Sequence, residues 1–467
     1  MRRDNALFYV RLLFCAMTFM LTALNGVGEA AKGLAVVQRQ ALSGVIDESG
    51  KEILPVAFAR VVILENQQIA VKKGGLYGVY NASGEIVIPP QYTQLLICED
   101  GTYLLRNGER KWGAVAADGR EVLPFEYKQV FDGDRGVFCV RREEGWWQLV
   151  RGEGVPVDGN GYSLLGNCCE GRVAASANNR WGFLDYDGHY AVEPQYEGVR
   201  AFSEGLAAVK RGGKWGFVDT EGKTVIRPQF SDLLYGFREG LACVRQDGKL
   251  AVIDTSGNVI FKKNFNLIFP FHDGLAEVRK TKKKLNVLQA IGYGVNIALG
   301  RIGRPPANIM DKTQKRGYID REGREIVPTS YDAVMPFHDG LAIVKKGKRW
   351  GALDRTGATR LELRFEELRS FHEGLAAARL DGKWNIIDVQ GNVKRELPPT
   401  VQDVGEFGMG LFPVKTNGKW GYMDVEGHIV IAPAYTNVRP FVPQGSADDG
   451  QEVYQDDAAE AATGGRE

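Results

Sequence analysis

Short runs of alternating apolar and polar residues fill most of the chain, and glycine-rich turns separate them. In KWGFVDT (214–220), Trp215 and Phe217 fall on one face of an extended strand, because successive side chains of a strand point to opposite sides. The following run, GKTVIRPQF (222–230), contains Pro228, which lacks a backbone N–H and so belongs at the edge of a sheet. This pattern predicts short strands joined by tight turns, an all-β fold.

The same run returns at a nearly constant interval. With Trp215 as the reference, the equivalent positions are 43, 77, 112, 147, 181, 215, 250, 316, 350, 384 and 420. Successive positions are 34 to 36 residues apart except for one step of 66. Tryptophan occupies seven of them: Trp112, Trp147, Trp181, Trp215, Trp350, Trp384 and Trp420. A period of this length indicates stacked structural repeats.

A turn signal follows each reference position. Seven residues after it all eleven copies have glycine, and four residues after it eight copies have aspartate. Asp-x-x-Gly is typical of a hairpin turn in which the carboxylate accepts backbone N–H groups and the glycine takes a positive φ. We therefore expect turn roles for these aspartates and glycines, among them Asp185, Asp219, Asp354, Asp424, Gly188, Gly222, Gly357 and Gly427.

Each unit is predicted to be a β-meander of three or four strands, and a second motif, FSEGLAAV (202–209), leads into the next copy. We expect the indole rings to pack between units: Trp112, Trp181, Trp215, Trp350, Trp384 and Trp420. Glycine follows all of them except Trp384, and we expect it to leave room for a neighbouring strand over the ring. A lone unit of about 34 residues cannot bury a sufficient core, so the units must stack. About eleven copies over 31–445 predict a propeller-like ring or rings, or an open β superhelix.

The motifs GKWGFVDTEG (213–222), KWGYMDVEG (419–427) and RWGALDRTG (349–357) resemble the WG-repeat (KWG-repeat) family of bacterial proteins. The resemblance covers nearly all of 33–441. It implies a β-rich repeat array with a role in interactions, and it implies no particular ligand.

The first thirty residues are typical of a secretory signal peptide. MRRDNALFYVR (1–11) is basic, LLFCAMTFMLTAL (12–24) is apolar, and small residues lie near Ala30. We expect an exported protein that is periplasmic, at the cell surface or secreted, with an uncleaved N-terminal membrane anchor as the alternative. Removal of 1–30 takes away three of 59 basic and two of 58 acidic residues, which leaves 56 of each. This balance argues against non-specific binding of nucleic acid.

A basic and apolar insertion interrupts the array at 280–315. It carries eight basic residues against one acid, and its candidate partner contacts are Lys282, Lys283, Lys284, Tyr293, Arg301 and Arg304. The insertion suits another protein, or a glycan or membrane surface. The alternative is a loop that folds back and buries its own apolar side on the array. Residues 446–467 have seven acids and one base, and we expect this acidic tail to be disordered.

Cysteine and histidine indicate no reactive centre. Cys139 and Cys243 occupy matching places and are expected to be small buried residues, while the adjacent Cys168 and Cys169 leave an intermolecular disulfide open.

His272, His338 and His372 share one place in three successive copies. Because packed sheets lie about 10 Å apart, we expect adjacent units to be too far apart to share a metal ion, and these histidines to be exposed turn residues. A metal-binding or pH-sensing column remains the alternative.

No nucleophile, zinc or phosphate-loop motif is present in the sequence. We expect a non-enzymatic binding or scaffold protein at the cell envelope, with no cofactor and with another protein as its partner. The alternative is a carbohydrate or cell-wall binder that uses Trp146, Tyr162 and Tyr190 as sugar platforms. A third reading is a glycoside hydrolase, whose paired carboxylates would come from the recurring aspartates.

Overall fold

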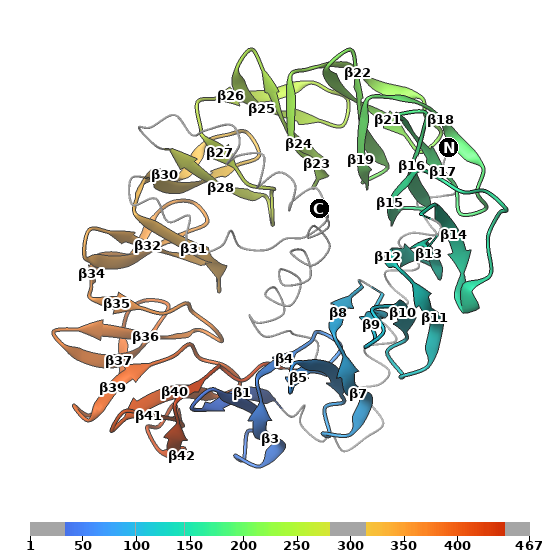
Figure 1. The fold of residues 1–467 in the computed structure, drawn as a ribbon. Helices are drawn as coiled ribbons and strands as arrows, with labels where there is room; N and C mark the ends of the chain where they lie inside the picture. Colours follow the sequence, from blue (N-terminus) through green and yellow to red (C-terminus); the bar gives the residue numbers. More distant parts are fainter. Residues whose placement is uncertain (1–32, 99, 144, 281–313, 444–467) are drawn as a thin grey trace, which may run out of the picture.

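The repeat copies fold into eleven small antiparallel sheets arranged in a ring. The computed structural model describes residues 33–98, 100–143, 145–280 and 314–443. Ten of the described sheets have four strands and one has three. Figure 1 shows the sheets in chain order around a common axis. The fold is an eleven-bladed β-propeller, in which each repeat copy supplies the third strand of one blade.

The blades, numbered from the N-terminus, share one strand order from the axis outward. The inner strands of blades 1 to 11 are β43 (Asn437–Val438), β4 (Arg60–Ile63), β8 (Gln94–Ile97), β12 (Gln129–Asp134), β15 (Leu164–Cys169), β19 (Gly198–Ser203), β23 (Asp232–Arg238), β27 (Leu267–Ile268), β31 (Ala333–His338), β35 (Glu367–Leu368) and β39 (Val401–Val404). The second strands are β1 (Leu34–Arg39), β5 (Ile69–Lys73), β9 (Tyr103–Arg106), β13 (Val137–Arg141), β16 (Arg172–Ala177), β20 (Leu206–Arg211), β24 (Leu241–Gln246), β28 (Leu275–Lys280), β32 (Leu341–Lys346), β36 (Leu375–Leu380) and β40 (Leu411–Thr416).

The third strands carry the reference positions and are β2 (Leu42–Asp47), β6 (Leu76–Tyr80), β10 (Trp112–Val115), β14 (Trp147–Arg151), β17 (Arg180–Leu184), β21 (Lys214–Asp219), β25 (Lys249–Asp254), β29 (Lys315–Asp320), β33 (Arg349–Asp354), β37 (Lys383–Asp388) and β41 (Lys419–Asp424). The outer strands are β3 (Glu52–Phe58), β7 (Ile86–Tyr92), β11 (Glu121–Tyr127), β18 (Tyr190–Tyr196), β22 (Thr224–Phe230), β26 (Val259–Lys263), β30 (Glu325–Tyr331), β34 (Thr359–Phe365), β38 (Val393–Glu396) and β42 (Ile429–Tyr435).

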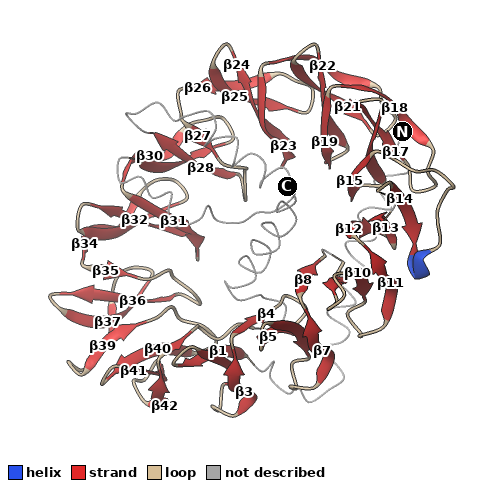
Figure 2. Ribbon diagram, viewed as in Figure 1, coloured by secondary structure: helices blue, strands red, loops and turns tan. Residues whose placement is uncertain are grey.

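Blade 4 is the irregular one. Its regular sheet ends at β14, the short 3₁₀ segment η1 (Gly152–Gly154) forms the third turn, and residues 155–162 pair with β14 only through isolated bridges. Figure 2 shows η1 as the one helical segment among the described residues. No helix in the described part of the chain is both long enough and apolar enough to span a membrane.

The two ends of the array meet in blade 1. Its inner strand β43 comes from the C-terminal end and pairs with β1, with Val37 opposite Val438. Leu34 N donates to Val442 O at 3.3 Å, and Val442 N donates to Leu34 O at 3.0 Å. The array is therefore a closed ring and not an open superhelix, and one sheet contains strands from both of its ends.

The core is divided among the junctions between blades. The described residues form eleven buried apolar clusters, and each draws its side chains from two adjacent blades, including blades 11 and 1. At the junction of blades 6 and 7, Phe217 and Ile226 pack with Leu233 and Phe237. A blade thus contributes one wall to each of two clusters, and no blade encloses a core by itself.

The tryptophans lie at the margin of these junctions. Trp215 pairs across the sheet with Phe230 and is half-buried, whereas Phe217 is 0% exposed. The Arg200 guanidinium lies 5.6 Å from the Trp215 ring. Of the six tryptophans predicted to pack between units, Trp384 is buried and the others are half-buried, namely Trp112, Trp181, Trp215, Trp350 and Trp420. The residue two positions after the tryptophan fills the centre of the junction.

The glycine after tryptophan accommodates a close approach within its own blade. A Cβ at Gly216 would lie 2.4 Å from the Ile226 carbonyl oxygen of β22. The β21–β22 register shifts between Trp215 and Phe217, which indicates a bulge that brings the outer strand against Gly216. The neighbouring strand for which this glycine leaves room is therefore the outer strand of the same blade.

The turn after the third strand combines two constraints. Asp219 Oδ1 accepts the backbone N–H groups of Glu221 at 3.1 Å and Lys223 at 2.9 Å, and Gly222 has φ +81°. A Cβ at Gly222 would also lie 2.9 Å from Val192 Cγ2 in the preceding blade. All eleven turn glycines have positive φ, and a Cβ at each would come within 3.4 Å or less of the preceding blade: Gly50, Gly84, Gly119, Gly154, Gly188, Gly222, Gly257, Gly323, Gly357, Gly391 and Gly427.

The first turn of a blade carries a hydrogen bond between blades. Glu204 and Gly205 have φ values of 56° and 77°, as a two-residue type I′ hairpin requires. Glu204 Oε2 accepts the Gly240 N–H of the next blade at 2.8 Å. We call this contact the carboxylate clamp. It recurs for the acids Glu170, Glu239, Asp339 and Glu373, each of which accepts a first-turn N–H of the following blade.

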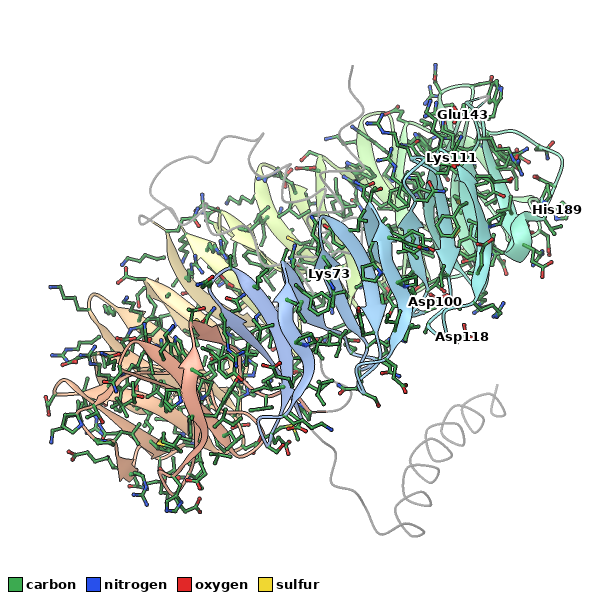
Figure 3. All side chains as sticks on the ribbon, turned by 60° about the horizontal axis from the view of Figure 1, so that its bottom comes forward. Lys73, Asp100, Lys111, Asp118, Glu143 and His189 are labelled. Atoms are coloured by element: carbon green, nitrogen blue, oxygen red, sulfur yellow. The ribbon has the colours of Figure 1, made fainter. Side chains whose placement is uncertain are left out.

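The two faces of the ring are distinguished by their turns. The clamp face carries the first and third turns, where Asp100 and Asp118 lie in blade 3, and the back face carries the second turns, where Lys111 and Glu143 lie. Figure 3 shows these two pairs on opposite sides of the ribbon. Lys111 forms an ion pair with Glu143 across blades 3 and 4, and the hydrogen bond from Lys111 lowers the pKa of Glu143.

We predict that Gly222→Val destabilises the ring more than Asp219→Ala does. The valine would have to hold a positive φ, at about 1–2 kcal/mol, and would also press on Val192, whereas loss of the aspartate cap costs about 1 kcal/mol. Chemical denaturation of the purified variants measures the difference. Gly213→Val is the matched control, because Gly213 has φ +72° and nothing within 4 Å of its Cβ position. Equal losses for Gly222→Val and Gly213→Val would contradict a role for the contact with Val192.

We also predict that Phe217→Ala costs more stability than Trp215→Ala. Removing a fully buried phenylalanine costs about 3–5 kcal/mol, and Phe217 lies at the centre of the junction while Trp215 lies at its margin. The denaturant midpoints of the two variants, compared at equal m-value, show which substitution lowers the free energy of unfolding more. A larger loss for Trp215→Ala would show that the indole ring is the main filling of the junction.

Candidate functional site

Two of the three equivalent histidines, His338 and His372, are in contact at the inner rim of the ring. The ring centroids of His338 in blade 9 and His372 in blade 10 lie 4.7 Å apart, with 41° between the ring planes. His372 Nε2 lies 3.9 Å from Glu406 Oε2 in blade 11. The expected separation of about 10 Å between units is wrong here, because the blades converge toward the axis (Figure 1) and their first turns come into contact. His272 is instead largely exposed beside Asp273.

A salt-bridge network lies next to the histidine pair. Arg369 donates through Nε to Val404 O at 2.9 Å and through Nη2 to Asp403 Oδ1 at 2.9 Å. Glu367 Oε2 lies 3.2 Å from the same Arg369 Nη2. A hollow of about 120 Å³ adjoins this network and is lined by Met335, Trp350, Glu367, Leu368, Arg369, Ser370 and Glu406.

The hollow can do little chemistry by itself. Pockets for small ligands usually measure about 300–1,000 Å³, so this one accepts no more than a single side chain of a partner. Arg369 is already paired with Asp403 and Glu367. Among the described residues, no group of three histidine, cysteine, aspartate or glutamate side chains is placed to hold a metal ion.

The recurring aspartates are engaged in their own turns. Asp354 Oδ1 accepts the Thr356 hydroxyl at 2.6 Å and the Thr356 N–H at 2.8 Å, and the hydroxyl hydrogen bond is the main cause that lowers the pKa of Asp354 to about 2. Asp185 and Asp424 likewise accept the backbone N–H four residues on. Carboxylates held in this way face turn N–H groups and not each other.

The aromatic residues considered as sugar platforms lie in different environments. Trp146 is 57% exposed, Tyr190 is half-buried, and Tyr162 is only 6% exposed. The Tyr162 hydroxyl donates to Asp158 Oδ2 at 2.6 Å, and burial raises the pKa of this tyrosine. The expectation of an exposed platform is therefore wrong for Tyr162, because the ring fills the core between blades 4 and 5.

The predicted partner contacts of the insertion, Lys282, Lys283, Lys284, Tyr293, Arg301 and Arg304, lie outside the described residues. The signal segment 1–30 and the acidic tail 446–467 also lie outside them.

Exposed apolar side chains gather at the start of the outer strands. We call this set the outer aliphatic band, and it consists of Ile86, Val225, Val259, Ile260, Val393, Ile429 and Val430. Ile86 is 60% exposed and Val393 is 54% exposed. The band follows the third turns and therefore lies on the outer margin of the clamp face. Among all exposed large apolar residues of the described chain, Trp146 is the one aromatic.

The sequence did not predict the carboxylate clamp between blades. The recurring Phe-x-acid-Gly-Leu motif was visible, but it suggested no partner for the acid. The signal that could have predicted the clamp is the acidic residue type at this turn position. Asparagine and glycine are the usual residues at this turn position, so a repeated glutamate or aspartate there indicates that its carboxylate has a partner elsewhere.

Comparisons with known proteins agree with the repeat pattern. The sequence profile of the WG containing repeat matches residues 77–96, 181–215, 215–249, 252–283, 317–350, 350–384, 386–420 and 420–445. None of the curated proteins compared with the chain is a significant match.

Three solved structures illustrate how distant the structural likenesses are. A crystal structure of the eukaryotic initiation factor shares 10% identity, with a TM-score of 0.42 and coverage of 79% of this chain and 96% of that one. Dihydro-heme d1 dehydrogenase NirN shares 10% identity at a TM-score of 0.32, with coverage of 90% and 77%. PorZ, a bacterial surface component of the type-IX secretion system of Porphyromonas gingivalis, shares 10% at 0.24, with coverage of 85% and 65%. At these TM-scores none of the three bears on the function of this chain.

The profile matches more than half of the chain, and matched copies such as 181–215 run from the third strand of one blade to the second strand of the next. The chain therefore belongs to the WG-repeat family.

Proposed function

We propose that this WG-repeat propeller is an exported, non-enzymatic scaffold that binds another protein at the cell envelope through its outer aliphatic band. The observation that carries the proposal is the composition of the exposed apolar surface, which is aliphatic apart from Trp146 among the described residues. These aliphatic side chains, which come from blades 2, 6, 7, 10 and 11, suit the apolar surface of another folded chain. A sugar platform would instead need a row of exposed aromatic rings.

Three further observations support a binding role over catalysis. The aspartates accept hydrogen bonds within turns, the hollow at the inner rim is small, and no group of three potential metal ligands occurs among the described residues. Repeat proteins present extended surfaces of this kind to large partners. The near-neutral charge removes the electrostatic basis for binding nucleic acid.

The basic insertion at 280–315 is a second contact region in this proposal, since its lysines and arginines suit an acidic partner surface. It interrupts blade 8 between β28 and β29.

The partner surface is tested by placing a photo-crosslinking residue at Ile260 or Val430 in cells. We expect adducts of higher mass at both positions and none at Lys214, an exposed control on the back face. Ile260→Lys should reduce partner recovery and leave the melting temperature unchanged, because the side chain is already 42% exposed. Adducts at Lys214 alone would contradict the proposed surface.

Two results would indicate a different function. Retention on cell-wall glycan that is lost in Trp146→Ala would identify a carbohydrate binder. Turnover of a sugar substrate that is abolished by Asp219→Ala in a folded protein would identify an enzyme.

Export is tested by the mature N-terminus. We predict that mass spectrometry of the protein from the envelope or medium finds a chain that begins at Ala31, because cleavage after Ala30 leaves β1 intact. A variant with Leu13 and Leu21 replaced by arginine should remain uncleaved in the cytoplasm. An intact Met1 on the envelope-associated protein would indicate the membrane anchor instead.

A further inference from the structure

Two cysteine side chains face each other across the junction of blades 4 and 5. Cys139 lies on β13 and Cys168 on β15, and their sulfur atoms are 3.6 Å apart. Cys139 Sγ also lies 3.3 Å from Gly166 O, and Cys168 Sγ lies 3.9 Å from Val137 O. Cys139 is 0% and Cys168 8% exposed, and both belong to the cluster that fills this junction. The two thiols are therefore immediate neighbours inside the core.

The carboxylate clamp does not extend to the junction of blades 4 and 5, although Arg151 of blade 4 forms an ion pair with Asp187 of blade 5. Blade 4 has a three-stranded sheet, and residues 155–162 take the outer position and pair with β14 through isolated bridges. The first turn of blade 4 has Arg135 and Gly136 at positive φ, where blades 5 to 10 have an acid before the glycine. Arg135 has no carboxylate, so it cannot accept an N–H of blade 5 as Glu170 accepts one of blade 6. The described residues form the clamp at five junctions, those of blades 5 and 6, 6 and 7, 7 and 8, 9 and 10, and 10 and 11. The junction of blades 4 and 5 is one of several without it, and a further link there would stabilise the ring.

We infer that Cys139 and Cys168 form a disulfide that joins blade 4 to blade 5. The inference rests on the proposed export, because disulfides persist in oxidising compartments. The loop closed by this bond spans a sequence separation of 29 residues, and closing such a loop restricts the unfolded chain. The sulfur atoms have to approach from 3.6 Å to about 2.05 Å, a movement within reach of side-chain rotation.

The bond forms by thiol–disulfide exchange with an external disulfide, either a small-molecule disulfide or an oxidoreductase of the compartment. The thiolate of one cysteine attacks that disulfide and releases one reduced thiol, which gives a mixed disulfide. The thiolate of the other cysteine then displaces the second thiol. The protein loses two protons and two electrons, and the external disulfide is reduced to two thiols. Because both sulfur atoms are buried in the folded ring, the exchange takes place as blades 4 and 5 close.

The remaining cysteines are in different positions. Cys169 follows Cys168 on β15, so its side chain leaves the opposite face of the strand, and it is half-buried. Cys98 belongs to the cluster between blades 3 and 4. Cys243 packs between blades 7 and 8, where burial raises the pKa of its thiol well above the ordinary value. Cys139 and Cys168 have their sulfur atoms 3.6 Å apart, and the burial of Cys168 argues against its use in an intermolecular disulfide.

The disulfide is tested on the mature chain, 31–467, isolated after export and also produced in a reducing cytoplasm. The exported protein is quenched with an alkylating agent and digested for peptide mass spectrometry. The cytoplasmic protein is unfolded, reduced and refolded with oxidised glutathione before the same treatment. We expect a Cys139–Cys168 peptide pair, the loss of two of five free thiols, and a melting temperature that falls when the protein is reduced.

Matched variants separate this bond from the alternatives. Cys168→Ser should lack the linked peptide and melt at a temperature that reductant does not change, whereas Cys243→Ser should behave as the wild type. Alkylation of both Cys139 and Cys168 in the refolded protein, or a bond that involves Cys169, would overturn the inference. A link that forms on refolding while the full chain fails to reach the envelope would leave the disulfide standing and remove the proposed export. A chain that is exported with both thiols free would support the proposed export and overturn the disulfide.

Discussion

Each blade of this protein depends on its neighbours for a core, and this dependence governs the rest of the structure. A sheet of about 34 residues buries too little apolar surface to be stable alone. The eleven apolar clusters therefore lie between blades, and the cluster between blades 11 and 1 exists because β43 and β1 share a sheet. Closure of the ring gives the first and last blades the same two-sided burial as the others.

Close approach between blades explains the residue that repeats without exception. The turn glycine has a positive φ, which other residues tolerate at some cost, but it also lies close against the preceding blade. Local and tertiary constraints coincide at this one position, so no copy departs from glycine. The aspartate of the same turn has only the local role, and three copies replace it.

The carboxylate clamp shows how a turn residue can connect units. Glu204 takes a positive φ that disfavours a side chain, at about 1–2 kcal/mol, and its carboxylate hydrogen-bonds to Gly240 of the next blade. The junction of blades 4 and 5 lacks the corresponding acid and contains two facing thiols instead. The proposed binding surface is the outer margin of the ring, where the exposed aliphatic side chains lie.

By itself the sequence determined the strands, the turns, the size of the unit and the number of copies, because alternation and positive φ are local properties of a few residues. It could not decide between a ring and a superhelix. That outcome depends on contacts such as Thr436 Oγ1 to Gln38 O, between residues 398 apart in the chain, and on the angle accumulated over eleven junctions. Only the tertiary structure placed Trp215 at the margin of its junction and His338 next to His372. The histidines are in contact because the blades converge toward an axis, which brings equivalent residues of neighbouring copies together.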